Sequence, residues 1–474
     1  MIITSFLAIL GLFLAIGLAS ARKATGERND YYLAGGSVSP WLTALSAVST
    51  NNSGYMFIGV IGYTYDVGLA SIWLMIGWIL GDFLGSLFIH KRLKHATVDT
   101  NEASFVSVLA HWQGKDSFPL WRRIAAVVMF VFLIAYASAQ ISAGGKALQG
   151  VLGFDPRLGA VAVAAIVIVY SIAGGLRASI WTDGAQSIAM VLAMGLLFIV
   201  GLNGVGGFSG AIDQWNALPG FLDIYPPDMI VAGVGGLALF IFGWLFAGFS
   251  VVGQPHVMVR FMAMKDENQM TQTRIWYYGY FILFYLLATG VGMLSRLYLP
   301  DLASLDPELA LPTMAVELLP DVLIGVILAG IFAATMSTAD SLVLSCSAAI
   351  THDLAPKRLE SSVALKAATA GSTLLALLLA LSGNQSVFSI VILAWSTLAC
   401  AFAPLLILFA LKRRISETNA IIMMAIGVGV ALIWRYGLGW HGDIYEGLPG
   451  ILSGVAFGWI VSKASAPKSE TADA

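Results

Sequence analysis

The sequence predicts an all-α polytopic membrane protein with thirteen transmembrane helices. Of its 474 residues, 58% are hydrophobic and 11% are charged, whereas about a quarter of the residues of a soluble domain are charged. A chain of this composition cannot bury its apolar surface in a water-soluble core, so the bilayer has to act as its solvent. Both cysteines, Cys346 and Cys400, lie in apolar runs, and we expect neither a disulfide nor a metal site from them.

Each predicted helix is a run of about 20 mostly apolar residues, the length that crosses a bilayer. A signal peptide has a positive residue before its apolar run, and the first run has none. We therefore interpret it as a membrane span that begins outside. No loop is long enough to form a soluble domain, and the chain has no GxxxxGK[ST] motif for nucleotide binding. The runs are 2–21, 40–62, 67–90, 124–147, 156–175, 181–202, 230–254, 275–298, 320–346, 363–383, 386–411, 418–438 and 446–463.

The distribution of positive charge supports this count. With the N-terminus outside and the C-terminus in the cytoplasm, 21 of the 25 Lys and Arg residues fall on the inner side and 4 on the outer side. Lys and Arg accumulate in cytoplasmic loops, and one span more or fewer would reverse every later assignment. We therefore expect a multi-pass protein of the cell (inner) membrane.

Two of the runs are interrupted by residues that a membrane helix disfavours. The stretch from Ser46 to Gly54 in the second run is mostly polar, and Asn, Ser and Gly all weaken a helix. The seventh run contains three glycines and ends before Pro255. Small polar residues can also form a helix interface, and proline alone can kink a helix, but we predict breaks in mid-membrane that expose backbone groups for binding.

The two interrupted runs are five runs apart, and this spacing favours an inverted repeat. Interrupted helices at matching places in two halves indicate the binding site of such transporters. We therefore expect an extra N-terminal helix (1–22), a first repeat (40–202), a second repeat (230–411), two extra C-terminal helices (418–463) and a disordered cytoplasmic tail (464–474).

Three further places carry polar residues within the runs. In the ninth run, Ala334, Ser337, Thr338, Asp340 and Ser341 share one helical face, and its oxygens suit a hard cation. Hydroxyls that bond back to their own helix would explain the Ser and Thr residues, but not the acid.

The other two places have good structural explanations. Asp183 would stabilise the first turn of its helix, with Thr182 as the cap. Asp82 lies in a Gly77-x-x-x-Gly81-x-x-x-Gly85 pattern that is typical of close helix packing, and we assign it no role.

At these residues the chain resembles the sodium/solute symporter family, and within it most of all the sodium/proline symporters. The resemblance extends from Asp30 to the Trp434-Arg435 region. Its most specific segments are Gly253-Gln254-Pro255-His256 with Arg260-Phe261-Met262-Ala263, and Ala334–Ser341 followed by Ala349-Ile350-Thr351-His352-Asp353-Leu354; Trp181-Thr182-Asp183 and Ala394-Trp395-Ser396 are also similar. It implies a LeuT-type fold with a five-plus-five inverted repeat, which agrees with the layout expected from the runs.

The resemblance also implies two sodium sites. The first would consist of the carbonyls of Ser49, Asn52 and Ala334 and the hydroxyls of Ser337 and Thr338. A second site, present in some members such as sialic acid symporters, would use Asp183, Ser337, Asp340 and Ser341.

A solute site is implied less specifically. Aromatic residues of proline symporters match Tyr55, Tyr136 and Trp244, and the candidate solute-binding residues are Asn51, Ser53, Gly54, Tyr55, Tyr136, Gln140, Trp244 and Pro255. Two departures separate this chain from the proline pattern: Asn51 replaces an aspartate, and three extra residues lie between Trp244 and Gly253, so that without a gap Val251 replaces a tyrosine.

These observations predict a sodium-coupled symporter that imports a small organic solute by alternating access, first of all proline or another compact amino acid. No Arg or Lys is expected in mid-membrane to bind an anion, but a sugar, sialic acid or carboxylate stays an alternative, as does a membrane sensor module. The sequence shows no HExxH, GxSxG or paired-acid motif of an enzyme. We expect Na+ as the coupling ion, no organic cofactor, the lipid bilayer and a small-molecule substrate as partners, and no nucleic acid; the oligomeric state, a monomer included, is left open.

Overall fold

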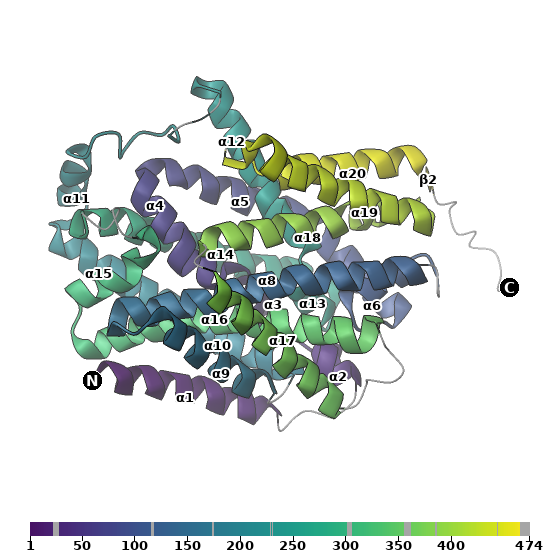
Figure 1. Cartoon of the computed structure of the whole chain (residues 1–474), viewed down its shortest axis with the longest axis horizontal. Coiled ribbons are helices and arrows are strands. Elements are labelled where there is room, and N and C mark those ends of the chain that lie inside the picture. Colours follow the sequence, from purple (N-terminus) through teal and green to yellow (C-terminus); the bar gives the residue numbers. More distant parts are fainter. Residues whose placement is uncertain are drawn as a thin grey trace.

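The computed structural model describes residues 1–21, 28–114, 118–172, 175–227, 229, 231–300, 306–354, 362–383, 386–442 and 444–464. The predicted tail lies outside these residues, apart from Ala464. The helices lie side by side with their axes mostly along the horizontal of Figure 1. Helix α1 begins at one end of this bundle, and α20 ends at the other, where α2 and α6 also lie (Figure 1).

The helical elements follow one another almost without interruption. They are α1 (Ile2–Ala21), α2 (Arg28–Leu33), η1 (Ala34–Gly36), α3 (Pro40–Gly54), η2 (Tyr55–Val60), α4 (Ile61–Val67), η3 (Gly68–Ser71), α5 (Ile72–Gly85), η4 (Ser86–His90), α6 (Lys91–Thr100), α7 (Phe105–His111), α8 (Pro119–Leu152), α9 (Pro156–Ile172), α10 (Gly175–Gly204), α11 (Gly207–Asn216), α12 (Gly233–Phe249), η5 (Ser250–Gly253), α13 (Pro255–Met262), η6 (Glu267–Gln269), α14 (Met270–Tyr298), η8 (Pro307–Leu309), α15 (Ala310–Leu318), α16 (Asp321–Ala348), η9 (Ala349–Leu354), α17 (Ser362–Ser382), α18 (Val387–Ala410), α19 (Glu417–Leu432), η10 (Ile433–Leu438), η11 (Trp440–Gly442) and α20 (Gly447–Val461). Two short strands, β1 (Arg413–Arg414) and β2 (Lys463–Ala464), pair antiparallel beyond the ends of α18 and α20.

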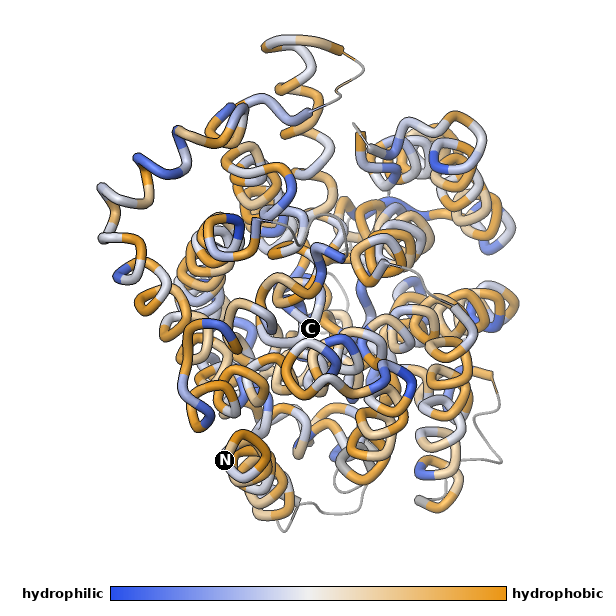
Figure 2. Tube along the Cα trace, turned by 60° about the vertical axis from the view of Figure 1, so that its left-hand side comes forward, coloured by the Kyte–Doolittle hydropathy of each residue, from blue (hydrophilic) through white to orange (hydrophobic). Residues whose placement is uncertain are grey.

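The predicted all-helical membrane fold is confirmed, whereas its count of thirteen spans stays a prediction. Among the described residues, ten helical stretches are long and apolar enough to cross a membrane. One of them, Pro40–Thr100, is 61 residues long and includes two of the predicted runs, and two other runs correspond to the shorter apolar helices Pro156–Val169 and Gly447–Val461. Orange, hydrophobic residues extend along most of the helices in Figure 2.

Both predicted helix breaks are present. In α3, Ser53 has φ 47° and ψ −179°, after which the chain continues as the π-helical turn η2 and α4. In the seventh run, Gln254 is extended at φ −99° and ψ 99°, and α13 begins at Pro255, a favoured first residue of a helix. The apolar stretch ends at Gly253, next to the predicted end of the run, and a second helical half continues from Pro255 to Met262.

The glycines around Asp82 pack α5 closely against α12, as the sequence pattern predicts. A Cβ atom on Gly77 would lie 2.8 Å from the Cβ of Trp244, and one on Gly81 would overlap the carbonyl of Leu245. In the opposite direction, a Cβ on Gly248 of α12 would overlap the carbonyl of Trp78. The two helices therefore meet backbone to backbone, and this contact brings Trp78 and Trp244 together.

We predict that Gly81→Ala destabilises the protein by about 1–3 kcal/mol, because overpacking a closely packed contact forces the backbone to shift. Gly279→Ala is the matched control, since no atom lies within 4 Å of the added methyl on α14. Thermal unfolding in detergent measures both variants. Equal melting temperatures for the two would contradict this account of the α5–α12 contact.

Candidate ion and solute site

The first group of polar residues lies where the broken helix α3 meets the continuous helix α16. The Ser49 and Ser337 hydroxyls are 2.9 Å apart, and the Thr338 hydroxyl donates a 2.9 Å hydrogen bond to the Thr50 carbonyl. These side chains and Ala334 are fully buried. The structure therefore places residues about 290 positions apart in the chain in one oxygen-rich contact, as the first predicted sodium site requires.

Asn52 adds uncommitted polar atoms near this contact. Its side chain is 1% exposed, and neither its Oδ1 nor its Nδ2 has a hydrogen-bond partner among the described residues. Its carbonyl accepts the N–H of Tyr55, across the break at Ser53. A buried amide without partners is costly, so this position favours a bound polar ligand.

A second group surrounds Asp183. Ser46 donates a 2.6 Å hydrogen bond to Asp183 Oδ2, and the Arg260 guanidinium lies 3.4 Å from the same oxygen. Arg260 also donates to the Ser341 hydroxyl and to Ser179 Oγ at 3.2 Å. The second predicted sodium residues Asp183 and Ser341 thus lie together, with an arginine between them.

Arg260 corrects one prediction from the sequence. The Arg260 side chain is fully buried, although we expected no Arg or Lys in mid-membrane. Because the seventh run continues beyond its break as α13, Arg260 lies inside the protein instead of at its inner surface. Its charge is matched by Asp183, which is also fully buried.

The structural explanation predicted for Asp183 is also wrong. Helix α10 begins at Gly175, so Asp183 lies more than two turns from its N-terminus, beyond the reach of the helix dipole. Thr182 is no cap, because its hydroxyl donates to the carbonyls of Ala178 and Ser179 in the preceding turn. Asp183 is oriented by Ser46 and Arg260 instead.

The candidate solute residues gather around the break in α3. Gln140 of α8 accepts the Gly54 N–H at 2.8 Å, and Ser53 Oγ accepts the Tyr55 N–H at 3.1 Å. Tyr136 donates to Ser53 Oγ at 3.4 Å. These bonds satisfy backbone donors that the break releases.

Aromatic rings cover this region on one side. The Tyr55 ring centroid lies 5.7 Å from that of Trp78 and 5.3 Å from that of Phe388, and Trp78 stacks on Trp244 at 6.0 Å. The sequence analysis missed Trp78 and Phe388, since an apolar ring in an apolar run carries no signal of its role. Trp244 therefore reaches Tyr55 through Trp78, despite the extra residues that follow it.

The second break contributes the remaining candidate. His256, next to Pro255, packs edge-on between Tyr136 at 5.4 Å and Trp395 at 6.2 Å. Gln254 donates to the carbonyls of Ser250 and Trp395 at 3.1 and 2.8 Å. Tyr136 thus contacts a residue at each break, Ser53 at the first and His256 at the second.

Asn51 takes part in a separate cluster. It donates to Asp82 Oδ2 at 3.0 Å and to the Tyr277 hydroxyl at 2.7 Å. Tyr277 and Tyr278 of α14 donate to Asp82 at 2.9 and 2.7 Å. Asn51 therefore connects the broken helix with α5 and α14.

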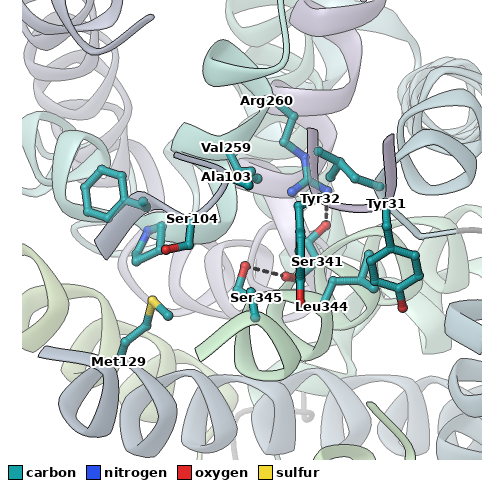
Figure 3. Close-up of a pocket in the computed structure, with 14 residues that line it drawn as sticks. Tyr31, Tyr32, Ala103, Ser104, Met129, Val259, Arg260, Ser341, Leu344 and Ser345 are labelled. Carbon is teal, nitrogen blue, oxygen red and sulfur yellow. Dashed lines mark hydrogen bonds between the residues drawn. The ribbon is translucent and has the colours of Figure 1, made fainter. Parts of the chain in front are cut away.

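A cavity lies between the Arg260 group and the residues Tyr31 and Tyr32 of α2. Figure 3 shows Arg260 bonded to Ser341, with Tyr32 and Ser345 beside them. The cavity is lined by Tyr31, Tyr32, Ala103, Ser104, Phe105, Met129, Leu176, Pro255, Val259, Arg260, Ser341, Leu344, Ser345 and Ala348. Its lining thus includes Pro255 at the second break and Tyr31 and Tyr32 of α2.

The chain is similar to known transporters over nearly its full length. A family model described as the sodium:solute symporter family matches residues 31–427. The osmoregulated proline transporter OpuE of Bacillus subtilis is 30% identical over 453 residues, which cover 93% of this chain and 90% of the relative. A sodium/proline symporter of Salmonella typhimurium is 30% identical over 468 residues, covering 96% and 91%.

Solved structures confirm the predicted LeuT-type fold. A Na+-coupled sialic acid symporter in its substrate-bound outward-open state superposes with a TM-score of 0.80 at 20% identity, and the match covers 97% of each chain. The nucleobase-cation-symport-1 family transporter Mhp1 in a closed conformation gives 0.55 at 15% identity, covering 90% of this chain and 92% of the other. At these identities the likeness concerns the fold alone.

We predict that Arg260→Gln lowers the free energy of unfolding by about 3–5 kcal/mol, because removing one partner of a buried ion pair leaves the other charge uncompensated. The double variant Asp183→Asn/Arg260→Gln should recover part of this loss, because it also removes the orphaned charge. Both are compared by thermal unfolding in detergent. A double variant no more stable than the single one would contradict the pairing.

Proposed function

The chain belongs to the sodium:solute symporter family, whose model matches residues 31–427, and we propose that it imports a compact amino acid with sodium, proline being the first candidate. In this proposal the repeats 40–202 and 230–411 enclose the region between the two breaks, which opens alternately to the two sides of the membrane. The helices 1–22 and 418–463 lie outside the repeats. The N-terminus lies outside and the C-terminus in the cytoplasm in this proposal. The inward sodium gradient drives the uptake of the solute.

The observation that carries the sodium assignment is the contact between α3 and α16. Sodium is a hard cation that takes oxygen ligands, and the proposed ligands are the hydroxyls of Ser337 and Thr338 with the carbonyls of Ser49, Asn52 and Ala334. The Ser49–Ser337 and Thr338–Thr50 distances of 2.9 Å support this assignment. Sodium there would connect the two helices and order the break in α3.

The second sodium site is proposed with a condition. The Arg260 guanidinium already neutralises Asp183 and bonds Ser341 in this structure. A sodium ion at Asp183, Ser337, Asp340 and Ser341 therefore requires Arg260 to move away, since two cations would repel each other there.

The solute assignment depends on the charge balance of the pocket. Its candidate residues (Asn51, Ser53, Gly54, Tyr55, Tyr136, Gln140, Trp244 and Pro255) are all neutral, and the Tyr55 hydroxyl and Gln140 Nε2 have no hydrogen-bond partner among the described residues. Lys146 is engaged elsewhere, because it forms ion pairs with Asp306 and Glu308. A zwitterion whose charges lie close together suits such a site better than a dicarboxylate.

Arg260 favours a second candidate, a larger solute with one carboxylate. Its guanidinium lines the cavity of Figure 3, so an anionic group entering this cavity would meet a cation. Asp183 already pairs with this cation and would compete with the carboxylate of the solute. We therefore rank the amino acid first.

We predict that Ser337→Ala and Thr338→Ala each raise the sodium concentration for half-maximal uptake about tenfold, or about 1.4 kcal/mol, because each variant loses an oxygen ligand of sodium that alanine cannot replace. Ser345→Ala is the control on the same helix, since this hydroxyl bonds back to the Ser341 carbonyl at 2.9 Å. Uptake into proteoliposomes measures the effect. An unchanged sodium dependence in the double variant would show that the site is misplaced.

A second sodium ion should make uptake cooperative in sodium, with a Hill coefficient above one. We expect Asp340→Asn to lower this steepness while some uptake remains, because the second ion loses a carboxylate ligand. Direct counting of sodium ions per transported solute complements the kinetics. If the wild type takes up a single ion per cycle, the second site is not used.

Excess unlabelled proline should compete with sodium-driven uptake and should raise the melting temperature of the purified protein when sodium is present. Both effects follow from ligand binding to the folded state alone. Sialic acid and a dicarboxylate serve as comparison solutes. If one of these does both and proline does neither, the amino-acid assignment fails while the family assignment stands.

A further inference from the structure

Asp82 is a buried acid at the core of the bundle that has no ion-pair partner among the described residues. Its side chain is fully buried in α5, and within the part of the chain that the structure describes, no Lys, Arg or His forms an ion pair with it. Asp183, by contrast, has Arg260. A charged carboxylate without a partner is expensive in the membrane interior and marks a functional site by default.

The groups that surround Asp82 hold its carboxylate in place without neutralising it. Asn51 and Tyr277 donate to Oδ2 at 3.0 and 2.9 Å, and Tyr278 donates to Oδ1 at 2.7 Å. All three donors are neutral. Because an ionised carboxylate accepts hydrogen bonds only, this arrangement is built for the anion, yet it leaves a net charge of one sign in the protein.

Arg274, a cation on the same helix as these tyrosines, is committed to another element. It donates to the Ser86 carbonyl at 2.7 Å and to Ser86 Oγ at 3.2 Å, both in η4. Helix α12 and η5, which pack against α5, carry no titratable residue. From α14, the titratable groups on this side are Tyr277, Tyr278 and Tyr285, and His90 lies further along η4 against Phe261.

Asn51 supplies a second oxygen at the same place. Its amide nitrogen donates to Asp82 and Tyr277, and the Oδ1 of the same amide group is buried and has no partner among the described residues. A carboxylate and an amide oxygen are suitable ligands for a small cation. Asn51 lies two residues before the break at Ser53, so a cation here would act directly on the broken helix.

We propose that Asp82 binds a monovalent cation, either sodium or a proton, during the transport cycle, at a site separate from the contact between α3 and α16. The proposal rests on the sodium-coupled cycle above, and it names a further coupling ion. Binding would neutralise the buried charge of Asp82. Its affinity must differ between the outward and inward states if the ion is to contribute to coupling.

The test uses the purified full-length protein and needs no solute. Equilibrium binding of 22Na+ counts sodium ions in the wild type, in Asp82→Asn and in Asp213→Asn, a matched change of an exposed acid on α11. Infrared difference spectra between acidic and alkaline buffer report protonated carboxyl groups. If sodium is the ion, Asp82→Asn binds fewer sodium ions than the other two proteins. If a proton is the ion, Asp82→Asn binds as many sodium ions as the wild type, but its spectrum lacks a protonated carboxyl band that the wild type shows.

Wild-type sodium binding together with a wild-type carboxyl band in Asp82→Asn would overturn the proposal. The double variant Ser337→Ala/Thr338→Ala separates it from the sodium site proposed above, since that variant should retain the cation at Asp82. If Asp82→Asn does not fold, Tyr278→Phe keeps the carboxylate but removes the donor to Oδ1. The anion is then less well stabilised, so the apparent cation affinity should rise severalfold, and an unchanged affinity would count against the site.

Discussion

A helix that breaks inside a bilayer must find new partners for the backbone groups that the break releases, because no water is available there. The first break meets this constraint with a side chain from a distant helix, and the second with the side chain of the break residue itself. Gln140 of α8 accepts the Gly54 N–H, and Gln254 donates to the Ser250 and Trp395 carbonyls. The region between α3, α8, α13 and α18 is therefore fixed by hydrogen bonds before any ion or solute enters it.

The sequence predicts the breaks and the polar face of α16 well because both leave local signals. A run of Ser, Thr and Asn from Ser46 to Gly54 is foreign to a membrane helix, and Ser337, Thr338 and Ser341 repeat with the period of a helix. The glycines near Asp82 likewise predict the α5–α12 contact, because close helix packing needs small residues at fixed spacing.

The sequence does not predict which charges and rings meet. In the sequence, Arg260 follows the apparent end of a span, which indicates a cytoplasmic residue. Only the structure shows that it lies on α13 and pairs with Asp183, 77 positions away in the chain. Asp82 is visible as an acid in an apolar run, but Tyr277 and Tyr278 lie about 195 positions further on. Trp78 and Phe388 look like any lipid-facing aromatic residue. In each case the partner is set by tertiary packing, which local patterns do not record.

The backbone contact between α5 and α12 has a consequence for how the molecule moves. Gly81 faces the Leu245 carbonyl, and Gly248 faces the Trp78 carbonyl, without a side chain between them. Sliding one helix along the other by a turn would drive Trp78, Leu245 or Phe249 into a neighbouring backbone. We therefore expect the two helices to move as one rigid body that carries Asp82, Trp78 and Trp244 together, with relative motion during transport at the surfaces where this pair meets α3, α14 and α18.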